Sequence, residues 1–290
     1  MIKIAHIVNP VNTGEENELY WQQPITFASM IAARKFAKKT AKGKVDVELF
    51  CVGYEEDTPA MPEGFTRLSD LHRSVLDIRQ FTTKQRKLPL FRDILDALES
   101  CTDNNAYMIQ TNVDICLMPH FYTTVAAMIE KGHRGLIINK RILPPIYCKT
   151  EELPLMYAEI GGDHNGYDCF VFEREVYHQY SMGNVCMGTP WSETTLAANM
   201  ACYCDNLTVL KKSHLTFHIG DSRTWMQLYD YRQHNIEEFA KVVMQLHRRF
   251  PDYILKHEII QWLIKKLRWE FKPHYSEDCH KLCDMTAYLT

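Results

Sequence analysis

The sequence predicts an α/β fold, a mixed and mainly parallel sheet flanked by helices, followed by a helical C-terminal appendage. Strand-like and helix-like segments alternate through the first two thirds of the 290 residues, which is typical of parallel sheets covered by helices. After Ser222 the pattern is helical throughout. With 46% hydrophobic residues, the chain has ample material for a core. We therefore expect a domain over residues 1–221 and a helical extension, packed on it, over residues 222–290.

The expected elements follow from apolar periodicity and from the positions of proline and glycine. Apolar runs and period-two alternation predict the strands, which cover residues 2–8, 45–52, 107–115, 136–142 and 169–172, with one or two more within 207–219. Helical periodicity predicts the helices, which cover residues 25–39, 88–98, 119–130, 193–204, 225–234, 236–249 and 253–271. Residues 53–65 and 144–166 are rich in proline, glycine and polar residues and are expected to be loops.

Composition disfavours several classes of protein. The first residues read as a strand rather than a signal peptide, and no apolar run reaches the roughly 18 to 20 residues needed to span a bilayer, so we expect a cytoplasmic protein. The net charge of −3 gives no reason to expect a nucleic-acid partner. The ten cysteines lack the paired C-x-x-C spacing of a structural zinc site and are expected to be reduced thiols.

The strand predicted over residues 107–115 ends in the polar Asn112-Val113-Asp114. Ligands of α/β sheets bind outside the carboxyl ends of the strands. A carboxylate at this place can hold a divalent cation and, through it, phosphate. The alternative is a turn, because Asn and Asp side chains readily cap the local backbone. Taken alone, the motif favours the turn.

Two common nucleotide-binding motifs are missing from the sequence. A P-loop requires G-x-x-x-x-G-K-[ST], and a dinucleotide-binding unit requires a glycine fingerprint after the first strand. After its first strand, this chain has Asn9-Pro10-Val11-Asn12 instead. The remaining candidate is Asn112-Val113-Asp114, holding a metal ion that bridges the two phosphates of a nucleotide-diphosphate sugar.

Two blocks of sequence carry a resemblance to a known family. Thr111-Asn112-Val113-Asp114-Ile115 resembles the D-x-D motif of GT-A-fold glycosyltransferases, the nucleotide-diphospho-sugar transferase superfamily, with Asn in place of the first Asp. Residues 166–172 and 187–193 resemble a second pattern of that family, Gly-x-Asp-aromatic-Phe-x-Phe followed by a tryptophan and an acidic residue. The resemblance covers about residues 1–220 and implies a GT-A-like, Rossmann-type sheet.

The resemblance implies a metal site and a catalytic carboxylate. Asp114 would bind Mn²⁺ or Mg²⁺ directly, with Asn112 on the ribose or on a metal-bound water. His218 is the candidate third ligand near the end of the domain. Glu193 would be the general base at a helix start, although acidic residues also favour helix N-termini for the macrodipole. Asp168 is the rival base, or binds hydroxyl groups of the donor sugar.

The resemblance also implies contacts with the donor. Asn9 and Asn12 lie in the loop where GT-A proteins hold the base and ribose. Arg73 and Arg86 would contact the diphosphate, or belong to a solvated basic face together with Lys84 and Lys87. Trp191 would stack on a sugar or be a core residue.

The appendage is basic and contains an amphipathic segment. Residues 241–272 contain eight Lys and Arg against three acidic residues, whereas the whole chain is slightly acidic. The segment 253–272 is therefore a candidate for peripheral contact with an anionic membrane that carries a lipid-linked acceptor. The alternative is packing on its own domain or on a second subunit of a homodimer.

The function that follows from the resemblance is metal-assisted transfer of a sugar. The donor would be a nucleotide-diphosphate sugar and the acceptor a hydroxyl group of a glycan or lipid-linked molecule, with the stereochemistry left open. The alternative is a non-catalytic nucleotide-sugar or carbohydrate-binding protein of the same fold. A nucleotidyltransferase would need a glycine- and lysine-rich loop after the first strand, which the sequence lacks.

Overall fold

A computed structural model describes residues 1–164, 166–222 and 228–285 of the chain. The chain forms two compact units that are interleaved along the sequence. The first unit comprises residues 1–72, 94–177 and 205–222, and the second comprises residues 73–93, 178–204 and 223–290. The start of the helix expected from Trp225 lies outside the described residues. A functional division at residue 222 stays a prediction.

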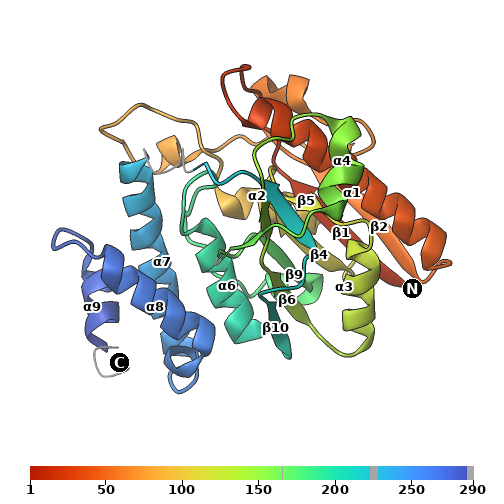
Figure 1. Cartoon of the computed structure of the whole chain (residues 1–290). Helices are drawn as coiled ribbons and strands as arrows, with labels where there is room; N and C mark the ends of the chain where they lie inside the picture. Colours follow the sequence, from red (N-terminus) through yellow and green to blue (C-terminus); the bar gives the residue numbers. More distant parts are fainter. Residues whose placement is uncertain (165, 223–227, 286–290) are drawn as a thin grey trace. The chain divides into compact units, whose positions relative to one another are not determined.

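The first unit is built on a seven-stranded sheet with the strand order β10-β6-β9-β4-β1-β2-β3 (Figure 1). Its strands are β1 (Ile2–Val8), β2 (Val45–Cys51), β3 (Thr66–Arg67), β4 (Tyr107–Thr111), β6 (Gly135–Ile138), β9 (Cys169–Glu173) and β10 (Leu207–Leu210). Only β9 runs antiparallel to its neighbours, β4 and β6, whereas the other pairs are parallel. The predicted fold class, a mainly parallel sheet flanked by helices, is therefore confirmed.

Helices of the first unit cover the sheet and bury its apolar side chains. Its helices are α1 (Leu19–Thr40), α2 (Phe91–Cys101, whose first turn belongs to the second unit), α3 (Phe121–Glu130), α4 (Leu153–Ala158) and α5 (Arg174–Tyr177). Its 3-10 helices are η1 (Glu55–Ala60) and η3 (Thr150–Glu152). α1 and α3 contact each other and β2, and they lie on one side of the sheet in Figure 1. α1 begins six residues before Ile25, and the side chain of Asn17, two residues before its start, accepts a hydrogen bond from the N–H of Leu19 at 3.0 Å.

A second, four-stranded sheet extends the first unit and has the order β5-β11-β7-β8. Its strands are β5 (Cys116–Leu117), β7 (Arg141–Leu143), β8 (Gly162–Asp163) and β11 (Thr216–Ile219). The single strand predicted over residues 136–142 is wrong, because the chain leaves the large sheet after β6 and enters the small one at β7. Asn139 and Lys140 make this step, and the side chain of Asn139 donates to the carbonyl of His164 at 3.0 Å.

The named elements of the second unit, within its described residues, are all helices. Its elements are η2 (Val75–Asp77), α6 (Ser192–Tyr203), α7 (Tyr229–Arg249), η5 (Ile254–Lys256), α8 (Glu258–Glu270) and α9 (Glu277–Met285). α6 packs on α7 and α8, and both of these pack on α9. The two helices predicted on either side of Asn235 form one continuous helix. The buried Asn235 side chain accepts from the N–H of Cys186 at 2.8 Å and donates to its carbonyl at 2.9 Å, so it is satisfied inside α7.

Two global features match the expectations from composition. All ten cysteines, every one of them in the described residues, are free thiols. Within residues 1–164, 166–222 and 228–285, the structure has no helix whose length and apolar character would let it cross a bilayer.

Candidate functional site

The Asn112-Val113-Asp114 motif is a turn, and it also presents a carboxylate. β4 ends at Thr111, and the N–H of Ile115 donates to the carbonyl of Asn112 at 3.1 Å. The turn leads into β5, which pairs with β11 and so brings Asp114 close to His218. Asp114 Oδ2 and His218 Nε2 are 3.1 Å apart although 104 residues separate them in the sequence. The two metal ligands expected from the sequence therefore lie together.

The hydrogen bond between His218 and Gly220 determines which of the two ring nitrogens of His218 carries the proton. His218 Nδ1 lies 2.7 Å from the carbonyl oxygen of Gly220, so this nitrogen must carry the proton. In the neutral imidazole, Nε2 is then an acceptor that faces a carboxylate oxygen. Two acceptors at this distance require a proton or a cation between them.

The pKa shifts of His218 and Asp114 also indicate a positive charge between the two side chains. Burial alone would lower the pKa of His218, but the Asp114 carboxylate outweighs it and the pKa is raised. Burial would raise the pKa of Asp114, but the charge and hydrogen bond of His218 and the charge of Lys140 lower it to about 2. The carboxylate is therefore ionised near neutral pH, and His218 is prepared to share a positive charge with it.

The Asp114–His218 pair fits a divalent metal ion. Two ligands bound about 2.1 Å from a metal at a right angle lie about 3.0 Å apart, close to the observed separation. Asp114 Oδ1 is buried and has no hydrogen-bond partner, so one carboxylate oxygen is left to accept. Among the residues that the structure describes, no group of three or more His, Cys, Asp or Glu side chains could hold a metal. Further ligands would have to be oxygens of a substrate or water, as is usual for Mg²⁺ at phosphate sites.

A second charged pair lies at the same end of the large sheet. Lys140 Nζ is 3.1 Å from Asp168 Oδ1, and the two side chains are only 13% and 10% exposed. Cys169 of β9 is in register with Thr111 of β4 and with Ile138 of β6. Asp168 therefore directly precedes β9, at the end of the sheet where β4 and β6 finish. Burial would raise its pKa, but Lys140 and His164 lower it, so Asp168 is a carboxylate.

Lys140 was not predicted from the sequence. It is the second residue after β6, in the polar segment that follows this strand as Asn112-Val113-Asp114 follows β4. Its charge lowers the pKa of both Asp114 and Asp168. The signal that could have found it is the polar Asn139-Lys140-Arg141, which interrupts the apolar residues 135–143.

Several buried oxygens at this edge have no hydrogen-bond donor. They are Gln110 Oε1, Asp114 Oδ1 and Asn139 Oδ1, whereas the oxygen Oδ2 of Asp168 lies 3.5 Å from His164 Nδ1. Buried acceptors of this kind are rare in folded proteins and call for a ligand or water that donates to them. These four acceptor residues lie in or next to β4, β6 and β9, so this edge is rich in acceptors and suits hydroxyl groups or a cation.

We expect Lys140→Met to destabilise the first unit, because it leaves the Asp168 carboxylate buried without its cation. The cost should be about 2 kcal/mol in the free energy of unfolding, the range for a hydrogen bond to a charged group. Urea denaturation of the single variants and of Lys140→Met/Asp168→Asn would measure it. The double variant should recover part of the loss. Strictly additive losses would contradict the pairing.

The loop after β1 contains the two asparagines expected at the nucleotide. Asn9 Nδ2 donates to the carbonyl of Val52 at 2.7 Å, and Asn12 N donates to Asp57 Oδ1 at 2.9 Å. Both bonds tie the loop to the segment after β2. Gln23 of α1 bonds the N–H and the carbonyl of Val11 at 2.8 and 2.9 Å. The loop is thus firmly held, and a nucleotide role for Asn9 and Asn12 stays a prediction.

The predicted basic contacts and the predicted base lie in the second unit. Arg73 forms an ion pair with Asp93 through two hydrogen bonds. The side chain of Arg86 is exposed, and its backbone N–H donates to the hydroxyl of Tyr231 at 2.6 Å. Glu193 lies in the first turn of α6 and accepts from the hydroxyl of Ser192 at 2.7 Å. Their roles in catalysis and donor binding stay predictions.

Trp191 is a core residue of the second unit, which is the second of the two alternatives considered for it. Its side chain is 1% exposed, its indole N–H donates to Glu270 at 2.8 Å, and its ring packs on Phe239. The backbone of Trp191 is left-handed, with φ of 81°, just before α6. A bulky residue in this conformation is strained, and such strain is held by the surrounding contacts.

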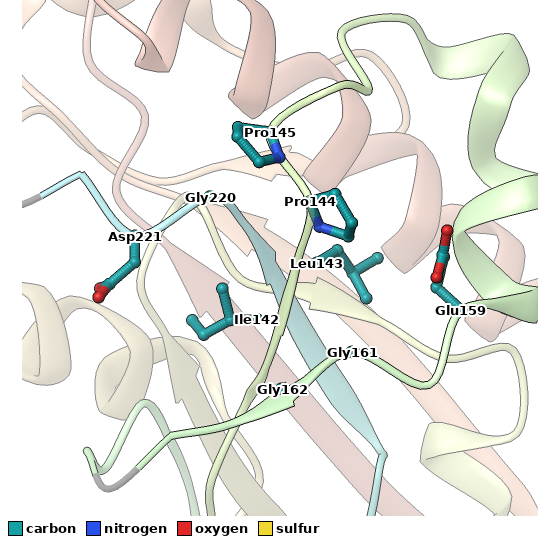
Figure 2. Close-up of a pocket in the computed structure, with 9 residues that line it drawn as sticks. All are labelled: Ile142, Leu143, Pro144, Pro145, Glu159, Gly161, Gly162, Gly220 and Asp221. Atoms are coloured by element: carbon teal, nitrogen blue, oxygen red, sulfur yellow. The ribbon is translucent and has the colours of Figure 1, made fainter.

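A pocket of about 460 Å³ opens in the first unit near the end of β11 (Figure 2). It is lined by Ile142, Leu143, Pro144, Pro145, Glu159, Gly161, Gly162, Gly220 and Asp221. The lining is largely apolar, with two carboxylates. Gly220 connects the pocket to the Asp114–His218 pair, since its carbonyl accepts the hydrogen bond of His218.

Comparisons with known proteins identify similar folds. No protein-family model and no curated protein matches the chain. It is similar to S. aureus TarS in complex with UDP-GlcNAc, with 10% identity, 92% of this chain and 73% of that chain covered, and a TM-score of 0.49. It is also similar to glucosyl-3-phosphoglycerate synthase from Mycobacterium tuberculosis in complex with Mg²⁺ and uridine-diphosphate, with 12% identity, 83% and 79% covered, and a TM-score of 0.45.

Proposed function

We propose that this protein is a glycosyltransferase that moves a sugar from a nucleotide-diphosphate donor to a hydroxyl acceptor, with Mn²⁺ or Mg²⁺ at Asp114 and His218. The observation that supports it best is the contact of Asp114 with His218, beside an unpartnered buried oxygen of Asp114. A carboxylate and an imidazole form a mixed oxygen and nitrogen donor set, which suits Mn²⁺ better than Mg²⁺. With so few protein ligands, the phosphates of the donor complete the site.

The proposal gives a role to each candidate site residue of the first unit. When bound, the metal would neutralise the charge that develops on the diphosphate as the sugar leaves. Asp114 and His218 hold the metal, and the carbonyl of Gly220 keeps the His218 lone pair on Nε2. Lys140 adds a fixed positive charge near both carboxylates. Asp168 and the acceptor oxygens of Gln110 and Asn139 accept hydrogen bonds from hydroxyl groups of the sugar.

Glu193 is the proposed general base and Asp168 its rival. A base must be ionised and within reach of the acceptor hydroxyl. Asp168 is buried against Lys140, which ties up its Oδ1 oxygen. This contact favours Glu193 for the base and Asp168 for binding. The acceptor is a glycan or a lipid-linked hydroxyl compound, and Asn9, Asn12, Arg73 and Arg86 are proposed contacts of the donor.

The alternative is a protein of the same fold that binds a nucleotide sugar without turning it over. Asn112 in place of an acidic residue is the feature that favours it. Release of the nucleoside diphosphate from UDP- and GDP-sugars, with and without candidate acceptors, separates the two. Binding with no release across the acceptors tested would favour the binding protein.

Mn²⁺ and nucleotide are expected to bind cooperatively. Because the described protein ligands are few, Mn²⁺ alone should bind weakly, and UDP or GDP should raise its affinity at least tenfold, or about 1.4 kcal/mol. Calorimetric titration of Mn²⁺ in the presence and absence of the nucleotide measures this. By linkage, Mn²⁺ must raise the nucleotide's affinity by the same factor. Equal Mn²⁺ affinity with and without every nucleotide would contradict the proposed site.

A further inference from the structure

An unusual exposed surface lies on α8 in the second unit. Trp269 is 85% exposed and Trp262 is 38% exposed, and Lys265 between them is also exposed. The spacing of three and four residues places these three side chains on one face of the helix. We call Trp262, Lys265 and Trp269 the tryptophan surface.

Trp269 and Lys265 contribute little to the packing of α8 in the second unit. The opposite face of α8 is apolar and buried, and it consists of Ile259, Ile260, Leu263, Ile264 and Leu267. These side chains already give the helix its packing. Trp269 is left almost wholly in water beside the partly exposed Trp262. Apolar side chains exposed together on one face can mark an interaction site.

The charges around this surface indicate the chemistry of the partner. Lys256, Lys265 and Lys272 are exposed on the helix or just beyond its ends, against the exposed Asp252 and Glu258. Residues 241–272 as a whole carry eight basic and three acidic side chains. Tyr253, 48% exposed, adds a further amphipathic ring. This excess of basic side chains favours an anionic partner.

We propose that the tryptophan surface binds the surface of an anionic lipid bilayer. Indole rings prefer the level of the lipid headgroups, where their apolar body and polar N–H are both accommodated. Long lysine side chains reach lipid phosphates from that depth, and each contributes to binding. α8 would lie parallel to the membrane, with its buried face still packed in the protein. This proposal goes beyond sugar transfer and holds whether or not the chain is an enzyme.

Flotation of the full-length protein with vesicles tests the proposal. We expect binding to vesicles of phosphatidylcholine and phosphatidylglycerol, and weaker binding to phosphatidylcholine alone. Trp262→Ala/Trp269→Ala should lower the ratio of bound to free protein about tenfold or more, and Lys265→Glu should lower it mainly for the anionic vesicles. The matched control is Leu155→Ala, which removes an apolar side chain that is 61% exposed on α4 of the first unit.

Three outcomes would overturn the proposal. One is no binding of the wild type to anionic vesicles. Another is binding that the double tryptophan variant retains in full. The third is loss of a dimer, or of heparin binding, in the tryptophan variant without any binding of vesicles, which would assign the surface to a second copy or to a soluble polyanion.

Discussion

Asp114→Asn is expected to lower the rate of sugar transfer about 10³-fold, the scale on which single charge-stabilising groups act in enzymes. The variant keeps the shape of the side chain but removes the charge that faces His218 Nε2 at 3.1 Å. Mn²⁺ should then lose its carboxylate ligand, and the cooperativity between Mn²⁺ and nucleotide should disappear. Steady-state transfer rates and calorimetric Mn²⁺ titrations measure the two effects.

The control for Asp114→Asn is Asp46→Asn, which neutralises an exposed carboxylate on β2 of the same unit. It should leave transfer and Mn²⁺ binding unchanged. Wild-type Mn²⁺ binding in Asp114→Asn would contradict the metal assignment. Loss of Mn²⁺ binding with wild-type transfer would show that transfer does not depend on this metal. The proposal of sugar transfer itself would then stand without the metal.

The sequence predicted the sheet well where local patterns determine the structure. The apolar runs of β1, β4 and β9 are buried strands, and their ends lie within a few residues of the expected positions. Asn112-Val113-Asp114 was given two interpretations, a turn and a ligand site. The backbone forms the turn, and its side chain contacts His218 as the second interpretation requires. One motif can satisfy both because the turn is what directs the side chain.

The sequence failed where distant segments determine the structure. β9 runs antiparallel between β4 and β6, a direction that its own residues do not encode. β6 pairs with β10 and β7 pairs with β11, so distant strands determine where the chain leaves one sheet for the other. Periodicity alone predicted a single strand there and missed Lys140. Gln110 and Asn139 were missed for a similar reason. Their unpartnered oxygens matter only because neighbouring strands bury them.

The helical part shows the same limit. Asn235 looked like a break between helices, since Asn has a low helix propensity and favours turns. Inside α7 its side chain instead bonds the backbone of Cys186, a contact that no local pattern contains. α9 was missed because its nine residues bury only Cys279 and Leu282, which gives a weak apolar pattern. The two units also interleave along the chain, an arrangement that no local pattern contains.

A buried histidine in β1 makes the stability of the first unit depend on pH. His6 is 0% exposed, and its two ring nitrogens lie 2.8 Å from the hydroxyl of Tyr122 and 2.9 Å from that of Thr111. One nitrogen donates and the other accepts, so the neutral ring satisfies both hydroxyl groups. A second proton would place an unpaired charge in the core. Burial accordingly lowers the pKa of His6 to about 3.

The protein is expected to lose about 2 kcal/mol of stability through His6 alone when the pH falls from about 8 to about 5. Below the ordinary pKa of 6.5 the unfolded chain binds a proton that the folded protein binds only near pH 3, so acid favours the unfolded state over that window. Above pH 6.5 the ring is neutral in both states and contributes no pH dependence. Urea denaturation of wild type and His6→Gln across this range measures the effect, because subtracting the two curves removes the contribution of every other titrating group. His6→Gln should be less stable at high pH, through loss of packing and hydrogen bonds, and should show a shallower pH dependence. Parallel curves for the two proteins would mean that His6 is protonated in the folded core.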